Sequence, residues 1–269
     1  MRIIDAHMHF FDTPNFHRLA SVSGHINSGR HLQQVFAENE IVHAVVMGNG
    51  ELSENGRDFP PFLSWCAGIN ADQLAPDKTE ESLFLAEEQL KSGRCVGLKF
   101  YVGYTHRYIS DPVYAPFFEL ARRYGCPVAV HTGSTAGTRG LLRYSHPLTI
   151  DEAASRYPDV RIVMCHFGNP WLTDAAAVIC KNANVCADLS GLLEGCFDLD
   201  RLFEEQAGYM EQLKTWLAYT GAWDRIMYGT DWPLVNIPLY IRFISRIVPE
   251  RHWDSVFFGN ANGIYGLGF

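Results

Sequence analysis

The sequence predicts a single (β/α)8 barrel spanning residues 1–269, and three observations carry this prediction. Eight short apolar runs alternate with segments of helical periodicity, a pattern typical of parallel strands covered on both faces. The length of 269 residues matches one such barrel. The chain also lacks the glycine-rich phosphate loop of open doubly wound sheets. The predicted strands are Arg2–Ala6, Val42–Met47, Leu63–Ile69, Cys95–Phe100, Pro127–Val130, Val160–Cys165, Val185–Asp188 and Arg225–Tyr228.

Helical periodicity and capping residues predict six clear helices between these strands. Asp111 and Pro112 form a cap and first turn, and Gly125 ends the same helix before the next strand. The stretch Asn49–Pro61 contains two prolines and two glycines and no helical stripe, so we expect a loop there. The predicted helices are Lys78–Lys91, Val113–Tyr124, Ile150–Arg156, Trp171–Lys181, Leu199–Thr220 and Leu239–Ile247.

Composition narrows the classes of partner. A net charge of −8 gives no basic face for nucleic acid. The seven cysteines are scattered without a C-x-x-C pair, which indicates free thiols in a reducing compartment. No apolar run approaches membrane-spanning length and no signal peptide is evident, so we expect a cytoplasmic protein without a membrane partner. Assembly into a homo-oligomer stays open.

The first predicted strand ends in the sequence H-x-H, at His7 and His9. Side chains two residues apart on a strand point to the same face, so both imidazoles can bind one ion from one side. In a (β/α)8 barrel the active site lies at the carboxyl ends of the strands, which is where these histidines are placed.

Three later strands also end in potential metal ligands or proton-transfer groups. His131 follows the fifth strand, His166 the sixth and Asp231 the eighth. Each one alone is more often a capping residue or a hydrogen-bonded core residue. Because all of them fall at strand ends of one barrel, we interpret the set as a metal site with proton-transfer groups.

Lys99 lies in the otherwise apolar fourth strand, and a lysine there needs a partner or a function. One interpretation is that a neighbouring carboxylate neutralises the Lys99 ammonium group, or that the side chain reaches out of the mouth of the barrel. The other is carbamylation by CO2, which would make the side chain a carboxylate-like bridge between two metal ions.

Several segments together resemble the amidohydrolase superfamily, and more closely its amidohydrolase-2 family, which includes aminocarboxymuconate-semialdehyde and resorcylate type decarboxylases. The resemblance spans nearly the whole chain and is specific for family, but it does not identify a substrate. The segments are GLKFYVGY, PVAVHTG, IVMCHFGNPW, ADLSG, YGTDWP and, at the closing helix, FFGNANGIYGL.

The resemblance implies a divalent ion, Zn2+ or similar, held by His7, His9, His131 and Asp231, with Asp231 and His166 as catalytic acid/base groups. In two-metal members of the superfamily, a carbamylated lysine bridges the ions and both later histidines bind the second one. That pattern would assign Lys99, His131 and His166 to a second ion. We favour one ion, because the closer motif match is to mononuclear members.

Side chains in the predicted mouth loops are candidates for substrate contact. A guanidinium would suit a carboxylate, and aromatic rings would suit a flat substrate. The substrate-binding candidates are Tyr101, Arg107, Arg139, Trp171 and Trp232, with Arg143 and Tyr104 beside them.

We therefore predict a metal-dependent hydrolase that opens an amide, ester or lactone of a small organic molecule by attack of metal-bound hydroxide. The alternative is a metal-dependent non-oxidative decarboxylase of a small aromatic or unsaturated acid. A binding protein built on a former enzyme barrel is a third reading, and the complete ligand set argues against it.

Overall fold

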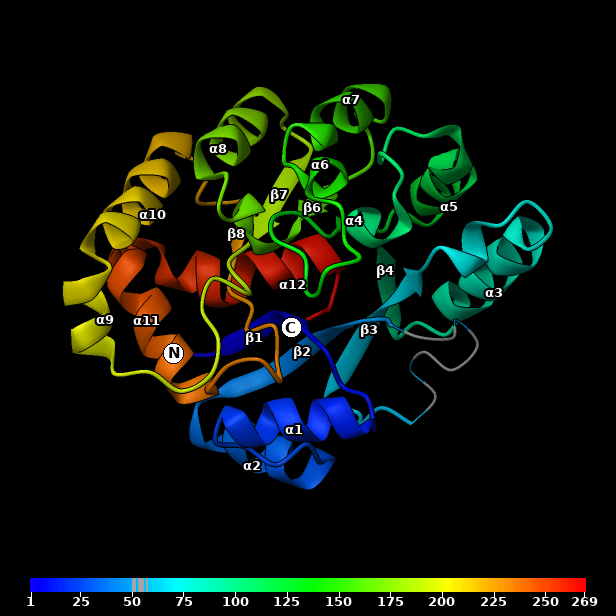
Figure 1. Ribbon diagram of the computed structural model, residues 1–269. Helices are drawn as coiled ribbons and strands as arrows, with labels where there is room; N and C mark the ends of the chain where they lie inside the picture. Colours follow the sequence, from blue (N-terminus) through cyan, green and yellow to red (C-terminus); the bar gives the residue numbers. More distant parts are fainter. Residues whose placement is uncertain (50–51, 53–55, 57) are drawn as a thin grey trace.

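The computed structural model describes residues 1–49, 52, 56 and 58–269. Eight parallel strands follow one another around a barrel in chain order, and helices surround them (Figure 1). The predicted fold is confirmed, and every predicted strand is present to within two residues at either end. The strands are β1 (Ile3–Met8), β2 (Ile41–Met47), β3 (Leu63–Ile69), β4 (Cys95–Phe100), β5 (Val128–Val130), β6 (Ile162–Met164), β7 (Val185–Asp188) and β8 (Ile226–Met227).

The barrel is closed between β1 and the segment that follows β8. The amide of Ala6 donates to the carbonyl of Tyr228 at 2.9 Å, and the amide of Asp231 donates to the carbonyl of His7 at 2.8 Å. Met8 also pairs with Trp232 as a parallel bridge. This seam brings the end of the first strand beside the segment after the last one.

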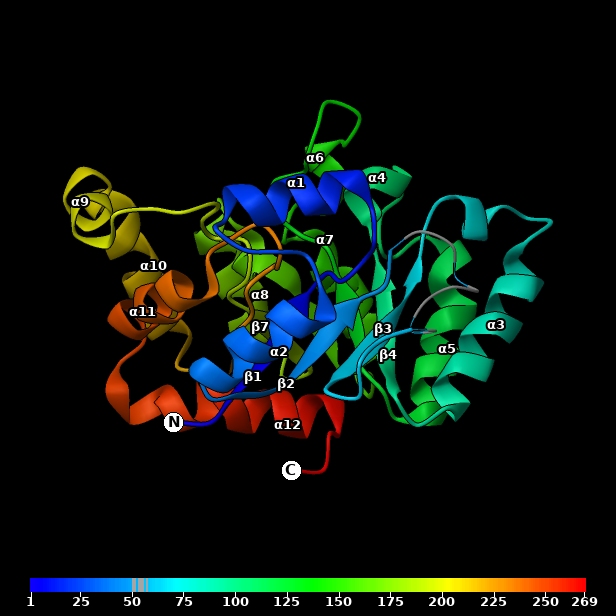
Figure 2. The same ribbon diagram turned by 90° about the horizontal axis from the view of Figure 1, so that it is seen from below.

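Alternating strand residues divide the core into two layers. Small and branched side chains such as Ile4, Ala6 and Val163 fill the inside of the barrel, while a larger layer packs between strands and helices. The carboxyl-terminal helix α12 (Asn260–Tyr265) contributes Ala261 to the inner layer and covers the amino-terminal end of the strands (Figure 2). At the opposite end, where the strands have their carboxyl ends, Figure 2 shows the helices α1 (Pro14–Val22), α4 (Val102–Thr105) and α6 (Leu142–Ser145).

Most predicted helices are present with small changes at their ends. The helices are α1 (Pro14–Val22), α2 (Gly29–Glu38), α3 (Thr79–Lys91), α4 (Val102–Thr105), α5 (Ala115–Tyr124), α6 (Leu142–Ser145), α7 (Thr149–Arg156), α8 (Leu172–Lys181), α9 (Leu199–Glu205), α10 (Ala207–Thr220), α11 (Ile237–Ile247) and α12. Short turns of helix are η2 (Asp72–Leu74), η3 (Pro112–Tyr114), η4 (Cys165–Gly168), η5 (Glu250–His252) and the π-helical η6 (Ser255–Gly259).

One helix prediction was wrong, and the structure contains helices that were not predicted. The single helix expected over Leu199–Thr220 is two helices, because Gln206 leaves the helical region (φ −114°, ψ 32°) and the chain changes direction there. The helices α1 and α2 were not among the six predicted, although Thr13 and Ser28 cap them with side-chain oxygens that accept from the amides of Phe16 and His31.

The loop expected at Asn49–Pro61 includes positions 50–51, 53–55 and 57, where the expectation lies outside the described residues. Between β2 and β3, the positions that are described contain no α-helix. Nowhere in the described chain is there a helix with the length and apolar character that a bilayer crossing requires.

Candidate metal centre

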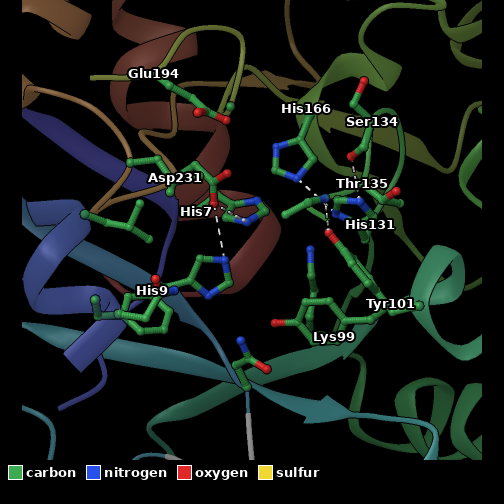
Figure 3. A pocket seen from close by; sticks show the side chains of 18 of the residues that line it. His7, His9, Lys99, Tyr101, His131, Ser134, Thr135, His166, Glu194 and Asp231 are labelled. Carbon is green, nitrogen blue, oxygen red and sulfur yellow. Dashed lines mark hydrogen bonds and ion pairs between the residues drawn. The ribbon is translucent and has the colours of Figure 1, made fainter. Parts of the chain in front are cut away.

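A cavity of about 530 Å³ opens at the carboxyl ends of the strands, within the range of small-molecule sites. Its floor comes from strand ends and its walls from α1 and the loops after β4, β5 and β7 (Figure 3). The lining residues are His7, His9, Asn15, Phe16, Leu19, Asn49, Asn70, Lys99, Tyr101, Tyr104, His131, Ser134, Thr135, Ala136, His166, Asn169, Gly191, Glu194, Asp231 and Leu234.

Three side chains converge on one point in this cavity, as Figure 3 shows. The Nε2 atom of His7 lies 3.4 Å from Oδ1 of Asp231, and Nε2 of His9 lies 3.2 Å from the same oxygen. The barrel seam explains the convergence, because it sets the end of β1 against the segment after β8.

Hydrogen bonds on the far side of each ring fix which nitrogen faces the cavity. Nδ1 of His7 lies 2.9 Å from Oδ2 of Asp188, and Nδ1 of His9 lies 3.1 Å from the carbonyl of Met47. Both partners are acceptors, so in a neutral ring each Nδ1 carries the proton and each Nε2 presents a lone pair. Metal-binding histidines are oriented in this way.

Two of the three converging atoms lack a hydrogen-bond partner among the described residues. Nε2 of His7 and Oδ1 of Asp231 are both buried and unpaired in the described structure. Leaving such groups buried and unpaired is expensive, and a cation among them removes the cost. Two neutral imidazoles and a carboxylate are a donor set that suits Zn2+ and similar divalent ions, so the residues present fit a metal.

The protonation states agree with this fit. Burial lowers the pKa of His7 to about 4, against the attraction of Asp188, so the ring is neutral near pH 7. Burial alone would raise the pKa of Asp231, but the contact with His9 and the nearby rings of His166 and His7 hold it below its usual range. Asp231 is therefore a carboxylate with lone pairs to offer.

His131 and His166 form a second pair at the wall of the same cavity. Nδ1 of His131 lies 3.2 Å from Nε2 of His166, and the other nitrogens face acceptors, the carbonyl of Ser134 at 3.1 Å and that of Ser190 at 3.2 Å. Burial lowers the pKa of both rings. Two neutral rings held in this way turn lone pairs toward each other, and a proton or a cation is needed between them.

The structure brings together the four histidines and the aspartate predicted from strand ends, but it places His131 beside His166 and outside the tight group of three. The rings of His7 and His166 have centroids 4.8 Å apart, so the two groups adjoin in one cavity.

The backbone is left-handed where β6 and β8 end. His166 and Phe167 have φ values of 61° and 45°, and Asp231 has 59°. Such conformations cost non-glycine residues roughly 1–3 kcal/mol each and persist where the surroundings impose them, often at functional sites. Next to them, Gly191 has φ 61°, and a Cβ there would lie 2.7 Å from Nδ1 of His166. The site therefore requires glycine at this position.

Two buried aspartates that were not among the predicted site residues organise the centre. Oδ1 of Asp188 accepts from the amides of His166 and Ser190, at 3.0 and 3.1 Å, while Oδ2 orients His7. Burial alone would raise the pKa of Asp188, but the attraction and hydrogen bond of His7 hold it low. Asp5 accepts from the Thr230 hydroxyl at 2.6 Å and so fastens β1 to the segment carrying Asp231.

A positional signal for Asp188 existed in the sequence, because it ends the seventh strand just as the predicted ligands end theirs. At the end of the apolar run Val185–Asp188, however, a single aspartate resembles an ordinary strand terminus. Its role in orienting His7 becomes evident only from the distance between the two side chains.

Lys99 lies on the floor of the cavity and is fully buried. Its Nζ lies 2.8 Å from Sγ of Cys165 and 5.2 Å from the centre of the Tyr101 ring. It makes no ion pair with any carboxylate in the described structure. The neutralising carboxylate considered for Lys99 is therefore not found among the described residues.

The other substrate-contact candidates divide between the cavity and elsewhere. Tyr101 lines the cavity, and its hydroxyl donates to the carbonyl of Gly48 at 2.6 Å. Trp232 is fully buried against His25, with ring centroids 4.8 Å apart, and lies outside the cavity lining. Trp171 packs against His146 outside the lining as well.

None of the three arginines proposed for a substrate carboxylate lines the described cavity. Arg107 pairs with Asp111 at 3.5 Å, and Arg143 stacks over Tyr144. Arg139 is exposed, and its carbonyl oxygen lies 2.7 Å from Nε2 of His106. Tyr104, by contrast, does line the cavity.

A (β/α)8 barrel with a candidate metal site of two histidines and an aspartate at its carboxyl end is typical of the class of metal-dependent barrel enzymes. The family model described as Amidohydrolase matches residues 64–267. The chain belongs to this amidohydrolase-2 family, whose members are metal-dependent enzymes acting on small molecules. A comparison with curated protein sequences gives no match.

Solved structures share the fold across the whole chain. They include 5-carboxyvanillate decarboxylase from Sphingomonas paucimobilis, with 14% identity, a TM-score of 0.66 and coverage of 98% of this chain and 99% of that one. A probable 2-pyrone-4,6-dicarboxylic acid hydrolase from Acinetobacter baumannii has 16% identity, a TM-score of 0.67 and coverage of 99% and 100%. A zinc-bound amidohydrolase from Burkholderia multivorans has 15% identity, a TM-score of 0.66 and coverage of 99% and 99%.

Proposed function

We propose that the chain is a metal-dependent hydrolase of an amide, ester or lactone in a small organic molecule. The observation that carries the proposal is the convergence of potential ligand atoms from His7, His9 and Asp231 on one point of a substrate-sized cavity, where those of His7 and Asp231 are buried and unpaired in the described structure. A divalent ion, Zn2+ in our proposal, supplies an activated water and polarises the substrate carbonyl when bound. The zinc in the Burkholderia multivorans structure supports this choice.

We assign the first three ligands to His7, His9 and Asp231, and the fourth to His131. Asp231 has a second role, because Oδ2 takes no part in the two ligand contacts and lies beside Gly191, where a Cβ would be 3.1 Å from it. Oδ2 takes the proton of the attacking water and passes it to the leaving group.

His166 is the second proton-transfer group. Its Nδ1 side faces the hydroxyl of Ser190 at 2.9 Å, and that hydroxyl also donates to Asp188. This arrangement stabilises the imidazolium that forms when Nε2 takes up a proton, so Nε2 can accept a proton and return it to the substrate.

We propose one ion and an unmodified Lys99. The group of three converges without Lys99, and Nζ has a partner in the thiol of Cys165. We also keep the proposal of a reducing cytosolic location, which agrees with seven free cysteines, four of them buried.

The test uses metal-loaded protein, a panel of lactones, esters and amides, and a second panel of aromatic acids in 18O-water and deuterated water. Hydrolysis puts solvent 18O into the product, whereas decarboxylation releases CO2 and puts deuterium on carbon. We expect solvent 18O in the product of the wild type. This hydrolysis should be lost in His166→Gln and kept in His146→Gln, whose ring pairs with Asp174 outside the cavity.

Carbon deuteration with CO2 release would replace the hydrolase by the decarboxylase that solved relatives include. Folded, metal-replete protein that turns over neither panel would refute an enzymatic role of this kind.

A further inference from the structure

Glu194 has a carboxylate with no partner beside the candidate metal centre. It lines the cavity, and Figure 3 shows its side chain on the same side as Asp231. Within the described structure it makes no hydrogen bond and no ion pair. None of the roles assigned above to the metal ligands and proton-transfer groups uses it.

The backbone around Glu194 is held firmly although the side chain is exposed. On one side, the amide of Leu192 donates to the Tyr240 hydroxyl at 3.1 Å, and its carbonyl accepts from Tyr209. On the other side, Gly195 donates to the carbonyl of Leu234 at 2.6 Å and accepts from the amide of Asn236 at 3.0 Å. Because the loop is held at both sides, the backbone of Glu194 has a defined position, and its side chain can place the carboxylate within the cavity that it lines.

The remaining charges around the described cavity are unevenly distributed. Of the described residues in the lining, Lys99 is the one lysine or arginine, and it is buried on the floor beside Cys165. The neutral polar groups of the wall, such as Asn15, Thr135 and Asn169, offer hydrogen bonds without charge. Among the described lining residues there is no arginine to receive a second carboxylate of a substrate.

We infer that Glu194 is a specificity-determining residue that selects substrates bearing a hydrogen-bond donor, a hydroxyl or an ammonium, away from the reacting group, and that rejects a second carboxylate there. A carboxylate at the cavity accepts from a donor and repels an anion, and such a repulsive element discriminates between ligands. This inference rests on the proposed function, because it places the reacting group at the metal centre.

The experiment measures binding of benzoate derivatives to zinc-loaded protein by calorimetry. Benzoate is the reference, and the 3- and 4-positions carry a carboxylate, a hydroxymethyl or an aminomethyl group. For the wild type we expect a dicarboxylate to bind at least roughly 10-fold more weakly than benzoate, and one donor-bearing series to bind more tightly. Whether hydroxymethyl or aminomethyl gives the larger gain identifies the kind of donor.

Glu194→Gln should bring the dicarboxylates to within roughly threefold of benzoate. The matched control is Glu204→Gln, which changes the net charge equally on exposed α9 outside the cavity and should keep wild-type preferences. Equal preferences in wild type and Glu194→Gln, with benzoate still bound in a zinc-dependent way, would overturn this inference and leave the proposed function standing. Absence of any zinc-dependent benzoate binding would overturn this inference as well, while the proposed function is decided separately by the turnover panels in isotopic water.

Discussion

Asp188→Asn tests whether the buried carboxylate sets the proton position on His7. In the wild type, Oδ2 accepts from Nδ1 of His7 at 2.9 Å, while Oδ1 accepts from the amides of His166 and Ser190. An asparagine that keeps its oxygen toward those amides turns its NH2 toward His7. Nδ1 must then become the acceptor, and the ring proton moves to Nε2, the atom that faces Asp231.

The expected loss follows from that change. A proton on Nε2 removes one of the ligands, and disturbing such an outer partner weakens metal binding roughly 10- to 100-fold. This corresponds to about 1.4–2.8 kcal/mol of binding free energy. The fold should survive, because asparagine has the shape of aspartate and keeps the bonds to the amides.

The assay is a zinc titration against a chromophoric chelator, together with nitrogen-15 spectra of the histidine rings. The spectra should show His7 changing from the Nδ1–H to the Nε2–H form. Ser190→Ala is the control, since it removes a hydroxyl that donates to Asp188 while leaving Oδ2 on His7, and it should weaken zinc binding less than roughly threefold. Zinc affinity of Asp188→Asn within twofold of wild type, or an equal loss in Ser190→Ala, would refute the reasoning.

Two further predictions concern catalysis and stability. Gly191→Ala should abolish turnover, because the new Cβ would contact His166. The control is Gly221→Ala, which has a similar φ of 59° and open space around it and should lose only about 1 kcal/mol of stability. Equal turnover in both variants would count against the site geometry. Burial lowers the pKa of His43 to about 4, with Arg94 adding to the effect, so the unfolded state binds more protons between pH 4 and 6.5 and stability falls as the pH drops through that window. Thermal melts of His43→Asn should show a smaller decrease from pH 7 to 5 than wild type, and an unchanged decrease would contradict the assignment.

The strand-end residues were predictable because a barrel sends every strand's carboxyl end to one face. That rule alone located His7, His9, His131, His166 and Asp231 in one cavity. It does not fix which of them share a point, since this depends on the barrel seam and on left-handed backbone.

Other features depend on contacts between distant segments. The role of Asp188 follows from its contact with His7, which is far away in the sequence. The role inferred for Glu194 follows from its place in the cavity lining. Trp232 looks like a pocket wall in sequence, beside Asp231, yet its ring turns into the core against His25. The break at Gln206 is not marked by a proline or an adjacent glycine. Helical periodicity therefore predicted one continuous helix through this position.

The central claim is that His7, His9 and Asp231 hold a divalent ion, and the most direct measurement is the metal content of folded wild type and His7→Ala after zinc loading and desalting. We predict one zinc per wild-type chain, an unmodified Lys99 in the intact mass, and no stoichiometric metal in His7→Ala with an unchanged circular dichroism spectrum. Stoichiometric zinc in His7→Ala, or none in the wild type, would contradict the ligand assignment. Two ions with a carbamate on Lys99 would contradict the one-ion proposal.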